Sequence, residues 1–123
     1  MRLTEKQTAC VVRALEPFSP TAIYVFGSHG TPARHPHSDI DIAFLPESCT
    51  DSFRVFQIAG TLSSELGSEV DLIDLSRAST VMRKEVLRTG QAIHVRDESA
   101  MREFEMRALS DYARLNEERH EVL

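Results

Sequence analysis

Short runs of β-branched and aromatic residues alternate along this chain with segments in which apolar residues recur at helical spacing. The strand-like runs occupy residues 22–26, 39–45, 70–73 and 92–95. Helical periodicity predicts helices from Thr4 to Pro17, from Asp51 or Ser52 to Leu66, over residues 79–89 and from about Asp97 to His120. This alternation predicts an α/β domain with a small mixed sheet of about four strands, flanking helices and a long C-terminal helix.

Residues at the helix ends support these boundaries. Thr4 and Gln7 have the spacing of a capping box. Gly67 directly follows the second helix, at the position where a left-handed glycine commonly ends one. Residues 29–38 contain Gly, Pro, His and Ser and have the composition of a loop.

Length and composition restrict the class of protein. The 123 residues suit one domain over residues 1–123, and 41% hydrophobic with 27% charged residues is typical of a globular chain. The net charge of −5 argues against general binding of nucleic acids or anionic membranes. Cys10 and Cys49 form no metal or disulfide pattern, and no apolar run is long enough for a membrane span. We therefore expect a cytoplasmic protein.

Two aspartates in the second strand-like run suggest a metal site. Asp39 and Asp41 are two residues apart, so in a strand both side chains lie on one face. Two carboxylates this close repel each other unless a cation neutralises them. Oxygen ligands of this kind suit Mg²⁺ or Mn²⁺. The alternative is a strand end with two solvated acids.

Gly27 and Ser28 follow the first strand-like run at once, where an anion-binding turn would lie. Glycine lets the backbone approach a phosphate closely, and serine adds a hydroxyl and an N–H. An ordinary turn would have the same two residues.

Asp71 supplies a third acid within an apolar strand pattern. A buried acid needs a partner, which a metal shared with Asp39 and Asp41 or a nearby arginine would provide. Asp74 lies three residues on and should face the opposite side of the strand, so Asp71 is the better candidate. Three carboxylates, a phosphate-binding turn and an α/β sheet together predict nucleotidyl transfer.

The spacing Gly27-Ser28, ten residues, Asp39-x-Asp41 resembles the signature of the DNA polymerase β-like nucleotidyltransferases. The short length and the run PHSDIDIAFLP resemble the minimal nucleotidyltransferase (MNT) antitoxins of HEPN–MNT toxin–antitoxin modules. The resemblance implies that Asp39, Asp41 and Asp71 form the catalytic, metal-binding set, with Mg²⁺ or Mn²⁺ as cofactor and ATP as substrate. It also implies that Gly27 and Ser28 hold the triphosphate.

One position departs from the family pattern. Many relatives carry a basic residue shortly after the Gly-Ser pair, whereas the first charged residue here is Arg34. Arg34 or one of the loop histidines would then contact the triphosphate.

The resemblance further implies a function and a partner. Such antitoxins transfer AMP from ATP to a tyrosine of a HEPN-family RNase toxin, with which we expect a hetero-oligomer. Two alternatives remain: neutralisation of the toxin by binding alone, and nucleotidyl transfer to a small molecule. The absence of a second domain that could build a small-molecule pocket weighs against the latter.

Three other patterns point less clearly to a site. The histidines of the loop, His29, His35 and His37, fit no standard zinc spacing. Arg114 and His120 are six residues apart and off one helical face, as on a solvated helix. The last helix has an apolar stripe of core type, and its distal Leu115 and Val122 suggest a partner surface.

Overall fold

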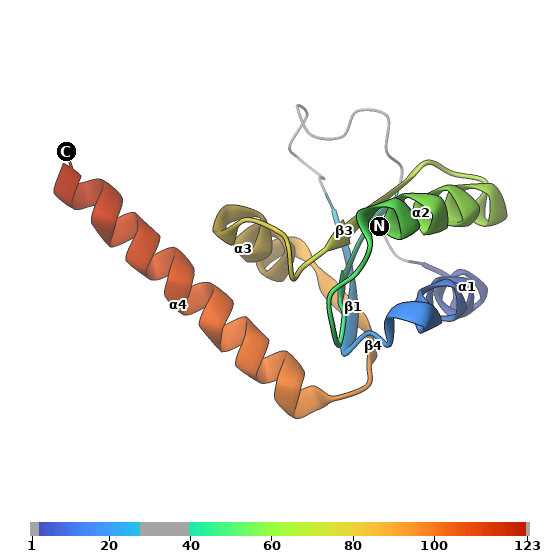
Figure 1. The fold of residues 1–123 in the computed structure, drawn as a ribbon, viewed down its shortest axis with the longest axis horizontal. Coiled ribbons are helices and arrows are strands. Elements are labelled where there is room, and N and C mark those ends of the chain that lie inside the picture. Colours follow the sequence, from blue (N-terminus) through green and yellow to red (C-terminus); the bar gives the residue numbers. More distant parts are fainter. Residues whose placement is uncertain (1–2, 28–39, 123) are drawn as a thin grey trace.

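A computed structural model describes residues 3–27 and 40–122, with side chains to residue 119. Figure 1 shows the arrangement of the elements. In chain order they are α1 (Glu5–Leu15), the 3₁₀ turn η1 (Glu16–Phe18), β1 (Ala22–Phe26), β2 (Ile40–Leu45), α2 (Ser52–Leu66), β3 (Val70–Asp74), α3 (Thr80–Thr89), β4 (Gln91–Val95) and α4 (Glu98–Val122). The predicted α/β class and the long last helix are confirmed.

The four strands form one mixed sheet in the order β3-β2-β1-β4. β1 is antiparallel to both β2 and β4, whereas β2 and β3 are parallel. Helix α2 makes the crossover that a parallel pair requires. The predicted mixed sheet of about four strands is therefore confirmed.

Helices cover both faces of the sheet. In β2, Ile40, Ile42 and Phe44 pack with α1 and α2. Ala43, which alternates with them, packs instead with residues of β1, α3 and α4. Figure 1 shows α1 and α2 on one side of the sheet and α3 and α4 on the other. A strand with both faces buried explains why 40–45 reads as a nearly continuous apolar run.

The predicted helix ends are confirmed in detail. Thr4 and Gln7 form both hydrogen bonds of a capping box. Asp51 caps α2, and Ser79 caps α3. Gly67 ends α2 with a φ of 67°, a left-handed conformation that favours glycine. The turn η1 after α1 was not predicted; Pro17 ends the α-helix but is compatible with a tighter turn.

Helix α4 is fastened to the domain by its N-terminal half. The Tyr24 hydroxyl donates a hydrogen bond of 2.9 Å to a carboxylate oxygen of Glu105. The Arg83 guanidinium lies 5.5 Å from the centre of the Phe104 ring, and Lys84 Nζ lies 4.9 Å from that of Tyr112. Beyond this contact α4 extends past α3 (Figure 1).

The core stripe predicted on this helix is confirmed by buried Ala108 and by Met101 and Phe104 against the sheet. The expected partner surface at Leu115 and Val122 stays a prediction. Leu115 is half-buried, and the large apolar side chains that are exposed in the described part of α4 are Met106 and Leu109. The side chain of Val122 lies outside the described residues. None of the described helices is long and apolar enough to cross a membrane.

Candidate active site

The candidate site lies at the edge of the sheet where β1 ends and where β2 and β3 begin. Asp41 is paired with Phe26, the last residue of β1, in the antiparallel ladder. The same residue is paired with Asp71 in the parallel ladder. Gly27 follows Phe26 directly and is half-buried. The strand order therefore brings Gly27, Asp41 and Asp71, which are distant in sequence, to one edge of the sheet.

Asp41 and Asp71 point to the same face because residues paired in register on neighbouring strands do so. Their strands are about 4.8 Å apart, the ordinary spacing in a sheet. Asp41 is 5% exposed and Asp71 is half-buried. Two adjacent carboxylates at different depths are hard oxygen donors of the kind that bind Mg²⁺ or Mn²⁺. The described part of the predicted acid set thus fits a divalent cation.

The remaining predicted site residues lie outside the described residues: Ser28, Arg34 and Asp39, together with the loop histidines His29, His35 and His37. Within residues 3–27 and 40–119, no three His, Cys, Asp or Glu side chains gather into a metal-binding group. The described residues contain two of the three predicted acids.

Asp74 has a structural role, and its predicted placement on the opposite face from Asp71 is confirmed. It is paired with Phe44 and 8% exposed. Its carboxylate accepts hydrogen bonds from the Thr50 hydroxyl and from Ser76, whose N–H and hydroxyl lie at 2.8 and 2.6 Å. Arg77 Nε lies 3.7 Å from the same carboxylate. Asp74 therefore joins the end of β3 to the segment after β2.

A groove beside β3 was not predicted from the sequence. One cavity, of about 440 Å³, lies between α2 and β3 and includes Phe56 and Asp71 in its lining. A second cavity, of about 330 Å³, is also lined by Asp71, with Ser52 and Val55 of α2. We call these two cavities together the α2–β3 groove. The signal available was two phenylalanines of α2, at positions 53 and 56, which do not belong to the apolar stripe of Val55, Ile58 and Leu62 that packs on the sheet.

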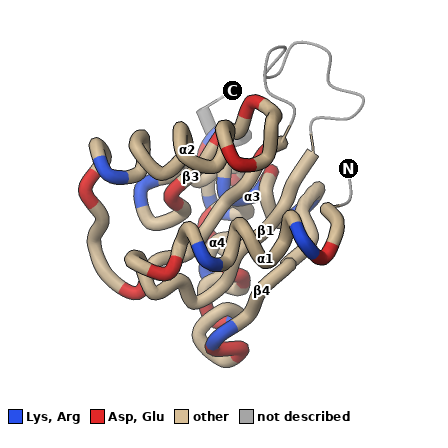
Figure 2. The backbone as a smooth tube through the Cα atoms, turned by 90° about the vertical axis from the view of Figure 1, so that its right-hand side faces the viewer, with Lys and Arg blue, Asp and Glu red and all other residues tan. Residues whose placement is uncertain are grey.

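Charge is distributed without a dominant basic face on the side of the molecule seen in Figure 2, where acidic and basic residues are interspersed along the helices. Many arginines pair with acids of the same helix, as Arg102 does with Glu98 and Arg107 with Glu103.

Comparison with known proteins identifies relatives of this chain. Residues 12–99 match the family model described as polymerase beta, nucleotidyltransferase. The protein adenylyltransferase MntA of Shewanella oneidensis is 36% identical over 101 residues, which are 82% of this chain and 72% of that protein.

Solved structures of toxin–antitoxin complexes contain similar chains. One chain from the tri-AMPylated Shewanella oneidensis HEPN toxin in complex with MNT antitoxin superposes with a TM-score of 0.80 at 30% identity, covering 98% of this chain and 95% of that one. A chain from a toxin–antitoxin structure with AMP-PNP gives a TM-score of 0.78 at 33% identity, again covering 98% and 95%. The shared fold extends over nearly the whole described molecule.

Proposed function

Because this chain belongs to the polymerase β family of nucleotidyltransferases, we propose that it is an antitoxin that transfers AMP from ATP to a tyrosine of a HEPN-family RNase toxin. One observation supports this most: Asp41 and Asp71 are paired in register at the sheet edge that Gly27 borders. The related MntA is itself named a protein adenylyltransferase. The reaction belongs in the cytoplasm, where ATP and such a toxin are both present.

In this proposal the acids hold the metal and the turn holds the nucleotide. Asp39, Asp41 and Asp71 bind Mg²⁺ or Mn²⁺, and Gly27, Ser28 and Arg34 contact the triphosphate of ATP. The bound cation supplies neutralisation of the charge on the triphosphate. The protein contributes mainly position and electrostatics.

The tyrosine oxygen forms a bond to the α-phosphorus, and the bond between that phosphorus and the bridging oxygen to the β-phosphate breaks. Pyrophosphate leaves with the electron pair of the broken bond. Asp71, the more exposed of the two described acids, accepts the phenolic proton. The product carries a new negative charge on the toxin, which repels the phosphates of RNA.

Intact-mass spectrometry of the toxin tests the proposal. The toxin is incubated with ATP, Mg²⁺ and a sub-stoichiometric amount of this protein, in parallel with Asp41→Asn and with EDTA. We expect mass gains in multiples of AMP with the unaltered protein alone and none in the other two reactions.

Two results would point elsewhere. An unchanged toxin mass, with RNase activity lost only at stoichiometric ratios, would establish neutralisation by binding alone. Transfer to small hydroxyl compounds but not to the toxin would establish a small-molecule nucleotidyltransferase.

A further inference from the structure

We propose that the α2–β3 groove, with Phe56 in its lining and Phe53 stacked beside Phe56, binds the segment of the toxin that carries the acceptor tyrosine. This inference rests on the proposed function and adds to it the surface that selects the acceptor.

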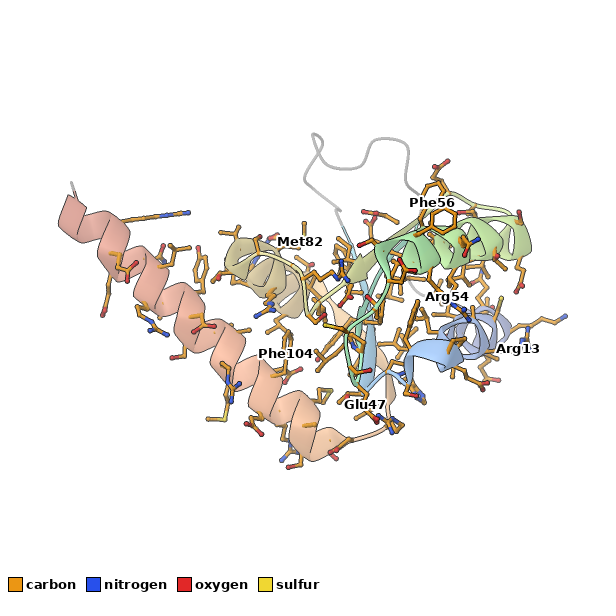
Figure 3. All side chains as sticks on the ribbon, viewed as in Figure 1. Arg13, Glu47, Arg54, Phe56, Met82 and Phe104 are labelled. Atoms are coloured by element: carbon orange, nitrogen blue, oxygen red, sulfur yellow. The ribbon has the colours of Figure 1, made fainter. Side chains whose placement is uncertain are left out.

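Phe53 and Phe56, which we call the aromatic pair, are unusually exposed. Their side chains are 64% and 73% exposed, and the two rings stack with centroids 6.5 Å apart at 28°. The core does not require them, because α2 packs on the sheet through a separate stripe that contains Val55, Ile58 and Leu62. Figure 3 shows Phe56 on the side of α2 that faces away from α1. Adjacent exposed aromatic rings of this kind mark binding surfaces.

The groove shares Asp71 with the candidate active site. Asp71 lines both of its cavities, and Phe56 lines the larger one. A tyrosine oxygen that gives its proton to Asp71 must approach this edge of the sheet. The Asp71 carboxylate lies on the face of the sheet opposite α2, and β3 is an edge strand. In this proposal the chain on one side of that tyrosine passes around the outer edge of β3 to α2, where the aromatic pair offers apolar contact.

The charge of the groove defines the occupant further. The charged residues that line the larger cavity are Glu69 and Asp71, and those that line the smaller one are Asp71, Asp74 and Arg77, so acidic residues outnumber the one basic residue. The whole chain carries a net charge of −5. The groove therefore fits a segment with an apolar side chain against the aromatic pair and a positively charged residue near the tyrosine.

A second exposed apolar pair provides a matched control. Met106 and Leu109 of α4 are 74% and 51% exposed and three residues apart, as Phe53 and Phe56 are. Neither lines the α2–β3 groove. Loss of either pair removes a similar kind of surface, but only the aromatic pair includes a residue, Phe56, that lines a cavity together with Asp71.

The test compares Phe53→Ser/Phe56→Ser with Met106→Ser/Leu109→Ser in AMP transfer at saturating ATP and Mg²⁺. We expect the first variant to raise the KM for the toxin at least about tenfold, the usual effect of losing a central aromatic contact. We expect the second to change it less than about twofold, and Phe53→Leu/Phe56→Leu to restore most of the loss because it restores apolar contact. The affinity for AMP-PNP, measured by calorimetry, should be the same in all variants.

Each other outcome is decisive. No transfer by the unaltered protein refutes the proposed function, whereas transfer with an unchanged KM in the aromatic variant refutes only the groove. If Phe53→Ser/Phe56→Ser weakens AMP-PNP binding as much as it raises the KM for the toxin, the aromatic pair belongs to the nucleotide site and the inference is overturned. A large effect of the α4 variant alone would place the toxin on α4 instead. If the double serine variant does not fold, Phe56→Gln repeats the comparison with a milder change.

Discussion

Asp71 and Asp74 lie on one short strand but face opposite sides of the sheet. Asp71 shares a face with Asp41, whereas Asp74 points to the other face and accepts hydrogen bonds from Thr50 and Ser76. Two acids three residues apart can therefore be separated by experiment, one through activity and the other through stability.

We expect Asp71→Asn to lower AMP transfer by at least about 100-fold, the usual contribution of a positioned base. Its melting temperature without metal should stay equal or rise, because removing one of two facing carboxylates relieves like-charge repulsion. Asp74→Asn should keep transfer while lowering the free energy of unfolding by about 2 kcal/mol, since a buried carboxylate loses charge-assisted hydrogen bonds. Mass spectrometry and thermal melting in EDTA measure the two effects. An Asp71→Asn variant that is stable and still transfers AMP would show that Asp71 takes no part in the reaction.

We expect Tyr24 to make the stability of the fold depend on pH in the alkaline range. Burial, and then the hydrogen bond to Glu105, raises the pKa of Tyr24 well above its ordinary value of 10.0. The folded state holds the phenol protonated more strongly than the unfolded chain does, so this stabilisation is present below about pH 10 and is lost as the pH rises further.

Tyr24→Phe should cost about 1 kcal/mol at neutral pH, because one hydrogen bond between the sheet and α4 is lost. The same variant should lose less stability than the unaltered protein as the pH rises above about 10, since it has no phenol to ionise. Urea unfolding at both pH values provides the comparison. Parallel losses in the two proteins would show that Tyr24 does not govern the alkaline transition.

At the scale of elements, the surroundings of Gly60 and Gly90 predict that replacement by alanine changes the free energy of unfolding in opposite directions. A Cβ at Gly90 would lie 2.4 Å from the Val86 carbonyl oxygen and 3.3 Å from Cβ of Phe26. Gly90 joins α3 to β4, so the backbone has little freedom to move there. A Cβ at Gly60, within α2, meets nothing within 4 Å.

We expect Gly90→Ala to lower the free energy of unfolding by about 2 kcal/mol or more through overpacking. Gly60→Ala should raise it by about 0.5–1 kcal/mol, the difference in helix propensity between the two residues. Chemical denaturation of both variants measures these changes. Similar values for the two substitutions would contradict the described contacts of Gly90.

The elements could largely be predicted from sequence because their signals are local. Thr4 with Gln7, Asp51, Gly67 and Ser79 mark helix ends within a few residues of chain, and each does so in the structure. The turn Glu16–Phe18 was missed because proline only excludes the α-helix and leaves the conformation of its neighbours open.

Less of the candidate site could be predicted from the sequence. That Asp41 lies opposite Asp71 depends on which strands are neighbours and on their register, and both are set by packing of residues far apart in the chain. The exposure of Phe53 and Phe56 likewise depends on which surfaces the other helices leave uncovered. The roles of Ser28, Arg34 and Asp39 stay predictions, since these residues lie outside the described part of the chain.

At the scale of the whole molecule, α4 is held along only part of its length. Its described contacts with the domain involve Phe104, Glu105, Ala108 and Tyr112, whereas residues 116–119 are exposed. The free energy of folding should therefore depend on the first half of the helix.

We expect a chain ending at residue 115 to unfold within about 1 kcal/mol of the full chain, because exposed helical residues contribute little. Phe104→Ala should cost about 2–3 kcal/mol, since it removes a large half-buried side chain from the core between the sheet and the helices α3 and α4. Thermal melting of the shortened chain and of Phe104→Ala measures the two losses of stability. Equal losses would mean that the distal half of α4 is also part of the folded unit.

The strand order has a consequence for synthesis on the ribosome. β1 pairs with β2 on one side and with β4 on the other, yet β4 comes some sixty-five residues later in the chain. While the chain emerges, the outer edge of β1 has no strand to complete it until residues 91–95 have left the exit tunnel. An open β edge pairs readily with other chains. Translation that stops before β4 would thus release a fragment that already contains Asp41 and Asp71 but presents an adhesive edge, whereas translation through β4 closes that edge.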